Sequence, residues 1–273
     1  IKSAMRRDLE LALLGPAHGV NPQVGAVILD KNGEIIAEGW HRGSGTAHAE
    51  VDALSKLDRV PAGATAVVTL EPCNHTGKTG PCAQALIEAG ISTVVYAVDD
   101  PGRESAGGAE TLRAAFIEVI DGVLSDEAEE QGRVWLTAHR NQRPYVTVKW
   151  ASSLDGRAAA NDSTSKWITG PESRADVHKR RSEADAILVG TGTVLADDPE
   201  LTARNADGTL YEHQPLRVVL GESELPINAR VFNSDAQTIQ LKTHSIFDAL
   251  NTLWTEKIKH VFVEGAPRVA SEF

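Results

Sequence analysis

The chain has 273 residues, with 27 Lys and Arg against 38 Asp and Glu, and hence a formal net charge of −11 at pH 7. At about 150 residues per domain this length predicts two domains, and a composition of 41% hydrophobic and 24% charged residues excludes a largely disordered chain. The acidic balance argues against nucleic acid as a partner, and apolar runs far shorter than the ~20 residues that span a bilayer argue against a membrane protein.

Periodicity and turn residues predict alternating helices and strands in the first half of the chain. We expect helices at 3–14, 47–57, 82–89 and 125–135, and strands at 24–29, 34–40, 65–70 and 91–98. Asn32 and Gly33 lie between the first two strands and predict a hairpin, because both residues tolerate positive φ. This alternation indicates a layered α/β domain, and the polar stretch 137–144 predicts a linker that separates a domain at 1–143 from one at 144–273.

The second half repeats the α/β pattern. Thr169, Pro171 and Glu172 predict a capping box that opens a helix to about Ala184. Strands are expected at 145–150, 186–190, 216–220 and 258–264.

Two segments of the second half could bind a phosphate. Residues 190–193 (Gly-Thr-Gly-Thr) follow a strand and form either an anion-binding turn or an ordinary tight turn. They lack the third glycine of a Rossmann fingerprint, because Leu195 stands in its place. The basic run 178–181 is either a solvated helix face or contains one arginine that binds a substrate phosphate through two hydrogen bonds.

The two cysteines are too few for a disulfide framework, and no charged segment followed by an apolar run marks a signal peptide. We therefore expect a cytoplasmic protein with reduced cysteines. The chain begins at Ile1 without a methionine and stops at Phe273, so we also expect it to be part of a longer protein.

One histidine and both cysteines form a predicted zinc site. His48, Cys73 and Cys82 supply one imidazole and two thiolates, and this set leaves the fourth tetrahedral position open for water, as in catalytic zinc sites. Glu50, two residues after His48, is placed to carry a proton, and the His-x-Glu and Pro-Cys pairs match the zinc deaminase signature. The gap between the cysteines is eight residues rather than the usual two. The alternative is a core histidine with two buried, functionless cysteines.

Residues 48–50 and 71–82, together with 21–25, resemble the bifunctional deaminase–reductases of riboflavin biosynthesis, for which the eight-residue gap is usual. The similarity extends over essentially the whole chain. It implies a cytidine-deaminase-like α/β/α domain followed by a dihydrofolate-reductase-like α/β domain that is incomplete at its carboxyl end.

For the first domain the resemblance implies zinc-dependent hydrolysis of the ring amine of 2,5-diamino-6-(ribosylamino)pyrimidinone 5'-phosphate. His48, Cys73 and Cys82 would be the zinc ligands and Glu50 the proton shuttle. Substrate contacts are implied at Asn21, His41, His75 and Lys78. For His41 a surface position, and for Lys78 a purely solvated one, stay open as alternatives.

For the second domain the resemblance rests on Lys149 and on the segments 151–156, 165–169, 190–194, 197–199 and 263–265. It implies NADPH-dependent reduction of the ribosyl side chain to give 5-amino-6-ribitylaminouracil 5'-phosphate. The implied NADPH contacts are Ala151, Trp167, Thr193 and Asp197, and the implied substrate contacts are Ser165, Arg181, Leu201, Arg204 and Glu264.

Two features depart from the family pattern. Ala266 replaces a glycine that usually follows Glu264 and Gly265, and the region 235–243 is short.

We expect a homo-oligomer that acts on a small phosphorylated pyrimidine, without nucleic-acid or membrane partners. The alternatives are a monofunctional zinc deaminase with a non-catalytic second domain, a nucleic-acid deaminase or binding module, and a structural zinc domain.

Overall fold

The computed structural model describes residues 1–77, 80–161, 168–265 and 267–273, and the chain forms two compact units, Ile1–Asn141 and Gln142–Phe273. The expectations for Lys78, Ser165, Trp167 and Ala266 lie outside the described residues. Within the described ranges, no helix combines the length and the apolar character needed to cross a membrane.

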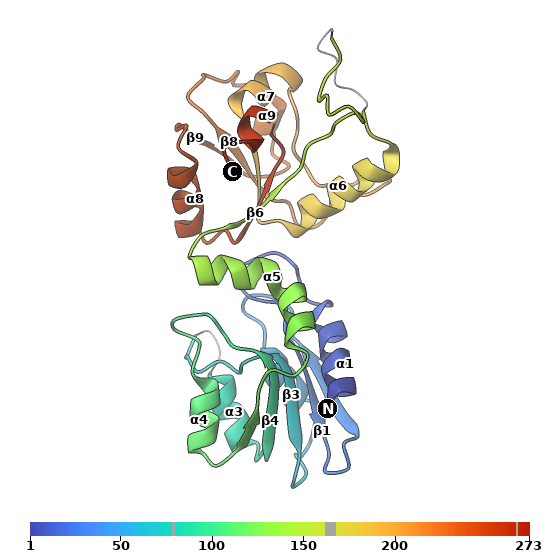
Figure 1. Ribbon diagram of the computed structural model, residues 1–273, viewed down its shortest axis with the longest axis vertical. Helices are drawn as coiled ribbons and strands as arrows, with labels where there is room; N and C mark the ends of the chain where they lie inside the picture. The colour runs from blue at the N-terminus through green and yellow to red at the C-terminus, as the bar shows by residue number, and fades with distance from the viewer. Residues whose placement is uncertain (78–79, 162–167, 266) are drawn as a thin grey trace. The chain divides into compact units, whose positions relative to one another are not determined.

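The first unit is a mixed sheet with helices on both faces (Figure 1). Its elements are α1 (Lys2–Ala12), β1 (Gly25–Leu29), β2 (Ile35–Trp40), α2 (Ala49–Leu54), β3 (Thr65–Leu70), α3 (Cys82–Glu88), β4 (Thr93–Val98), α4 (Gly108–Ala114), β5 (Glu118–Ile120) and α5 (Ser125–Asn141). The strand order is β2-β1-β3-β4-β5, with β1 antiparallel to β2 and β3, and the remaining pairs parallel.

Alternation along the strands divides the apolar residues of this unit between two cores. On β3, Val67 packs with Met5 of α1, whereas its neighbour Val68 packs with Leu86 of α3. Successive strand residues point to opposite faces of a sheet, so β3 serves both cores. Helices α1 and α5 therefore cover one face, and α2, α3 and α4 cover the other.

A glycine on β2 allows α2 to lie very close to the sheet. A Cβ atom on Gly39 would lie 2.2 Å from the carbonyl oxygen of Ala49 and 2.5 Å from the amide nitrogen of Ala53. No other residue fits at that distance, so Gly39 determines how closely the start of α2 approaches the sheet.

The second unit is a parallel sheet. Its elements are β6 (Tyr145–Val148), α6 (Pro171–Glu183), β7 (Ala186–Gly190), α7 (Thr191–Asp197), β8 (Leu216–Leu220), the 3₁₀ helix η1 (Arg230–Phe232), β9 (Thr238–Leu241), α8 (Ile246–Thr255), β10 (His260–Val263) and α9 (Pro267–Ala270). The strand order is β6-β10-β7-β8-β9. Because these strands are parallel, their carboxyl ends meet at one edge, which is where open α/β sheets bind ligands.

The predicted α/β class is confirmed, whereas several local predictions were wrong. Helix α5 continues to Asn141 through most of the expected linker, because Leu136 and Ala138 are buried in its last turns. Gly170, not Thr169, is the residue before α6, and it makes no side-chain cap. Residues 191–193, predicted as a turn, form the start of α7, and α4, β5, α8 and β9 were not predicted.

Candidate active sites

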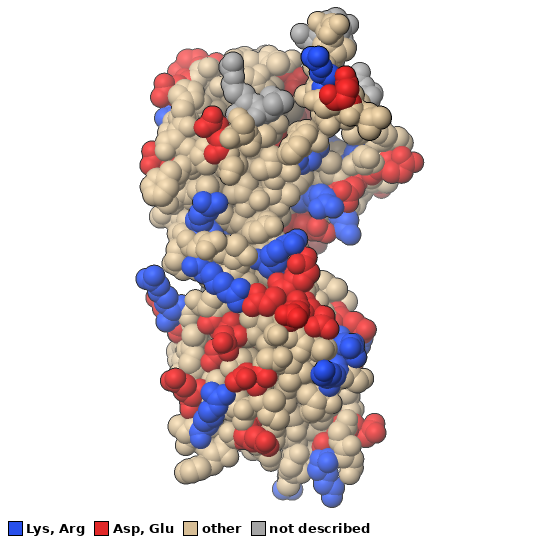
Figure 2. All heavy atoms as spheres, viewed as in Figure 1, with Lys and Arg blue, Asp and Glu red and all other residues tan. Residues whose placement is uncertain are grey.

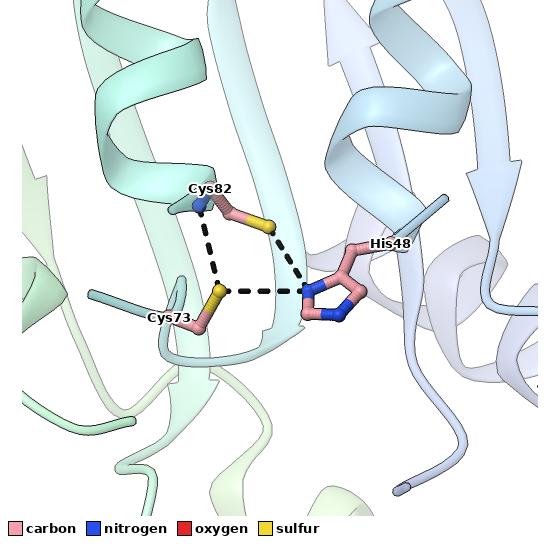
Figure 3. A group of neighbouring side chains, drawn as sticks. All are labelled: His48, Cys73 and Cys82. Carbon is pink, nitrogen blue, oxygen red and sulfur yellow. Dashed lines mark hydrogen bonds between the residues drawn. The ribbon is translucent and has the colours of Figure 1, made fainter. Parts of the chain in front are cut away.

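Three side chains from separate elements of the first unit converge on one point (Figure 3). His48 is the residue before α2, Cys73 follows β3, and Cys82 begins α3. The Nδ1 atom of His48 lies 3.2 Å from Sγ of Cys82 and 3.5 Å from Sγ of Cys73. All three ligand atoms lie within 4.8 Å of one another.

This geometry fits zinc. Zn–N bonds of about 2.0 Å and Zn–S bonds of about 2.3 Å in a tetrahedron place nitrogen and sulfur roughly 3.5 Å apart. A hydrogen bond from the Cys82 thiol lowers the pKa of Cys73 well below its ordinary value, and the amide N–H of Cys82 also donates to Cys73 Sγ at 3.4 Å. A thiolate is the form that binds metal, so the donor set suits a zinc ion.

Glu50 lies beside these three residues. It occupies the first turn of α2 and is only 4% exposed, and its carboxylate contacts the thiol of Cys82. Burial raises the pKa of Glu50 to about 7. A carboxyl group with that pKa can both accept and release a proton near neutrality.

The expected contacts Asn21 and His41 form a pair. The Nδ1 atom of His41 lies 3.0 Å from the carbonyl oxygen of Ala47, which can only accept, so Nδ1 carries the ring proton. The Nε2 atom of His41 therefore accepts from Nδ2 of Asn21 at 2.8 Å. His41 is buried, which excludes a surface position and lowers its pKa, and the ring of His41 also stands edge-on to His48.

His75 carries a buried Nδ1 atom that has no hydrogen-bond partner among the described residues. Such an atom is costly unless another molecule bonds to it. It lies two residues after Cys73, so this unsatisfied atom suits a contact with a bound molecule near the zinc ligands.

Glu71 is a site residue that sequence reasoning missed. Its buried carboxylate accepts from the amide nitrogens of Asp100, Gly107 and Ala109 at 3.0–3.2 Å. These bonds attach the segment 100–109 to the strand end that precedes Cys73. The sequence signal was its place at the start of the motif 71–82, two residues before Cys73, whereas its bonding partners lie 29–38 residues away.

In the second unit, the structure brings together Arg181 and Glu264 and adds Lys149, for which no contact was predicted. Arg181 donates to both carboxylate oxygens of Glu264, at 2.5 and 3.0 Å, and Lys149 lies 3.4 Å from Oε2. Burial raises the pKa of Glu264, but the contacts with Arg181 and Lys149 together hold it below its ordinary value. Lys149 and Glu264 directly follow β6 and β10, at the carboxyl edge of the sheet.

Two other members of the basic run, Lys179 and Arg180, lie on the exposed side of α6, whereas His178 is half-buried with its Nδ1 atom 3.1 Å from the carbonyl oxygen of Thr202. Lys179 and Arg180 are exposed and pair with Glu183 and Asp176 of their own helix. The solvated-face interpretation therefore holds for these two residues, and Arg181 alone reaches Glu264.

The other expected contacts of this unit lie on two segments after β7. Thr193 is half-buried and Asp197 exposed on α7, and a Cβ on Gly192 would meet nothing within 4 Å. Leu201 is buried and Arg204 is half-buried on the segment after α7. Ala151, half-buried, lies three residues after β6.

Two family models match the chain. The model of the cytidine and deoxycytidylate deaminase zinc-binding region matches residues 1–98, and that of the RibD C-terminal domain matches residues 144–273. The first range contains His48, Cys73 and Cys82, and the second contains Lys149, Arg181 and Glu264.

Similar proteins are known over most of the chain. The riboflavin biosynthesis protein RibD of Mycobacterium tuberculosis is 51% identical over 253 residues, which are 92% of this chain and 74% of that protein. The protein of the same name from Aquifex aeolicus is 42% identical, over 93% of this chain and 77% of its own.

Solved structures agree with these relatives. The crystal structure of a diaminohydroxyphosphoribosylaminopyrimidine deaminase/5-amino-6-(5-phosphoribosylamino)uracil reductase from Thermotoga maritima superposes with a TM-score of 0.89 at 40% identity, covering 100% of this chain and 82% of that one. RibD of Acinetobacter baumannii gives 0.90 at 38% identity, with the same coverage. With a zinc-binding deaminase region in its first part and a reductase domain in its second, this chain belongs to the family of bifunctional deaminase–reductases of riboflavin biosynthesis.

Proposed function

We propose that the first unit hydrolyses the ring amine of 2,5-diamino-6-(ribosylamino)pyrimidinone 5'-phosphate. We propose that the second then reduces the ribosyl side chain of the product with NADPH, giving 5-amino-6-ribitylaminouracil 5'-phosphate. The observation that carries this proposal is the convergence of His48, Cys73 and Cys82 beside the buried Glu50. The substrate follows the name of the Thermotoga maritima relative.

In the deaminase half, His48, Cys73 and Cys82 would hold the zinc ion and Glu50 would move the proton. When bound, zinc lowers the pKa of water to about 7 and so supplies the nucleophile at neutral pH. Glu50 takes the proton of the attacking water and delivers it to the nitrogen that departs as ammonia. Its position at the start of α2, two residues from His48, keeps its carboxylate beside the ligands without making it one.

Asn21 and His75 would orient the pyrimidinone. Because Nδ2 of Asn21 donates to His41, its Oδ1 is left to accept from the substrate's ring or amine N–H groups. His41 then acts through Asn21 rather than on the substrate. The unpartnered Nδ1 of His75 supplies a second polar contact, and Lys78, outside the described residues, is proposed for the phosphate.

In the reductase half, NADPH when bound supplies the hydride, and the protein binds and orients the two molecules. Ala151, Thr193 and Asp197, with Trp167 outside the described residues, are proposed to contact the cofactor.

The substrate contacts proposed for this half are Arg181, Leu201, Arg204 and Glu264, with Ser165 outside the described residues. Glu264, held by Arg181 and Lys149, can accept from ribose hydroxyls, and the arginines suit the phosphate.

The deaminase proposal is tested by Glu50→Gln. The substitution keeps the volume of the side chain but cannot shuttle a proton, so ammonia release from the diaminopyrimidine phosphate should fall by about 10²–10⁴-fold. Zinc content, measured by atomic absorption, should stay at the unsubstituted level. Full ammonia release by this variant would contradict the role of Glu50 and favour a structural zinc domain.

The reductase proposal is tested in the same Glu50→Gln chain. Supplied with the deaminated intermediate, it should oxidise NADPH at the rate of the unsubstituted chain. Absence of turnover by both zinc-loaded proteins would favour a monofunctional deaminase whose second unit is not catalytic.

A further inference from the structure

Arg217 is the largest fully buried side chain that the structure describes, and it lies on β8 outside both proposed sites. Its guanidinium donates to the carbonyl oxygens of Glu200 (3.1 Å), Asn233 (2.6 Å) and Ala236, and to Oδ1 of Asn233 (2.7 Å). An apolar side chain could fill this volume but could not bond to these oxygens, and burying a guanidinium carries a desolvation cost. Arg217 therefore connects two backbone segments, 198–204 and 233–236.

Each of these segments carries one carboxylate that holds Arg204. The Nη2 atom of Arg204 lies 2.7 Å from Glu200 and 3.4 Å from Asp235. Asn233, which accepts from Arg217, also donates from Nδ2 to Asp235 at 3.2 Å. The orientation of Arg204 thus depends on the separation of two segments that Arg217 connects.

The first segment is strained. Asp198 and Leu201 have φ of 42° and 55°, in the left-handed region that residues with a Cβ seldom adopt. Such strain persists only where surrounding contacts hold it. The bond from Arg217 to the carbonyl of Glu200, next to Leu201, is one such contact.

Arg204 still has capacity for a ligand. Within the described residues, its Nε donates to Thr202, its Nη1 to Gly208 and its Nη2 to the two carboxylates, so four of its five N–H groups are used. Its side chain is 29% exposed. One N–H remains for an anionic oxygen.

We propose that Arg217 is a positioning residue of the reductase half, which connects segments 198–204 and 233–236 and so orients Arg204 and Leu201 toward a phosphorylated substrate. This inference rests on the proposed role of Arg204 in binding that substrate. Arg217 itself touches neither substrate nor cofactor.

The test compares NADPH oxidation with the deaminated intermediate and with its dephosphorylated form, in the full zinc-loaded chain. The measured quantity is the ratio of kcat/KM for the two substrates. Arg204→Ala should lower this ratio roughly tenfold by removing a charged contact to phosphate. Arg217→Met should also lower the ratio, mainly by raising the KM of the phosphorylated substrate. Arg217→Lys should lower the ratio less than Arg217→Met does. Arg180→Met, the same change at an exposed, ion-paired arginine, should leave the ratio unaltered.

Circular dichroism and thermal unfolding of each variant are the controls for folding of the second unit, and the deaminase activity of the variant is the control for the first unit, which holds the zinc ligands. Asn233→Ala is a milder variant, because it removes only one acceptor of Arg217, and it should also lower the ratio. If the Arg217 variants do not fold, the result for Asn233→Ala tests the positioning role. In the Arg204→Ala background, Arg217→Met should lower the ratio no further.

The outcomes distinguish the proposed substrate contact of Arg204 from the positioning role of Arg217. If Arg204→Ala leaves the ratio unchanged, the proposed substrate contact is wrong and the inference fails with it. If Arg204→Ala lowers the ratio while Arg217→Met and Asn233→Ala do not, or lower kcat/KM equally for both substrates, the inference alone is overturned.

Discussion

At the scale of single residues, both sites depend on side chains whose orientation is decided by a second polar group. The carbonyl oxygen of Ala47 determines which nitrogen of His41 carries the proton, and His41 in turn determines which end of the Asn21 amide is left for a ligand. Glu264 is held in the same way by Arg181 and Lys149. Removing His41 should therefore weaken substrate binding without removing a substrate contact.

We expect His41→Ala to raise the KM of the deaminase substrate roughly tenfold with a smaller change in kcat, because Asn21 loses the partner that orients its amide. Steady-state ammonia release and zinc content measure the effect, and the zinc content should not change. His244→Ala, at an exposed histidine, is the control. An unaltered KM would show that Asn21 needs no partner.

At the scale of elements, helix α1 buries a carboxylic acid against the sheet. Asp8 is 0% exposed, and neither of its carboxylate oxygens has a hydrogen-bond partner among the described residues. Burial raises the pKa of Asp8 well above its usual value, and Glu38 and Glu50 add to this increase while Arg7 opposes it. Gly25 allows this close packing of α1 on the sheet, because a Cβ at that position would lie 2.0 Å from the Asp8 carbonyl oxygen.

This acid should make the first unit less stable as pH rises. The folded state holds the Asp8 proton more tightly than the unfolded state, whose pKa is about 3.9, so the free energy of unfolding falls from about pH 4 up to the folded-state pKa. Asp8→Asn removes the ionisation and should stabilise the unit by about 1–3 kcal/mol at pH 7, with a smaller gain at pH 5.

Thermal unfolding of the zinc-loaded protein between pH 5 and pH 8 measures this difference. Glu10→Gln, at an exposed carboxylate of the same helix, should change the unfolding temperature little at any pH. A gain for Asp8→Asn that is the same at both pH values would show that Asp8 is not protonated in the folded protein.

At the scale of the whole molecule, each unit has its own apolar cores, and the zinc ligands lie in the first unit. The net charge is −11, and on the face shown in Figure 2 acidic and basic residues alternate over both units, with no extended basic area among the described residues. This distribution disfavours a nucleic-acid deaminase. The expected homo-oligomer and the cytoplasmic location stay predictions.

Because the zinc ligands and the reductase residues belong to different units, metal removal should separate the two activities. Treatment with a zinc chelator should abolish ammonia release and leave NADPH oxidation with the deaminated intermediate within about twofold of its starting rate. Restoring zinc should recover ammonia release. Equal loss of both activities on chelation would contradict the independence of the two units.

Local patterns predicted many elements and one site. The strands at 65–70, 186–190 and 216–220 have the predicted bounds, because continuous β-branched and apolar runs end at clear turn residues. Helix α5 was predicted too short because only tertiary burial of Leu136 and Ala138 shows that the polar stretch after them is helical. The strand β9 was missed because its residues are only partly buried and show no strong alternation.

The sequence by itself determined the α/β class and the zinc ligands, since His48, Cys73 and Cys82 are chemically distinctive residues on local motifs with characteristic spacing. Only the tertiary structure decided the pairing of Arg181 with Glu264, 83 residues apart, the orientation of Asn21 by His41, and the burial of Arg217. Carboxylates, amides and guanidinium groups occur throughout the chain, and local pattern does not distinguish a solvated one from a partnered one. Their roles follow from the contacts that folding brings together across long separations in sequence.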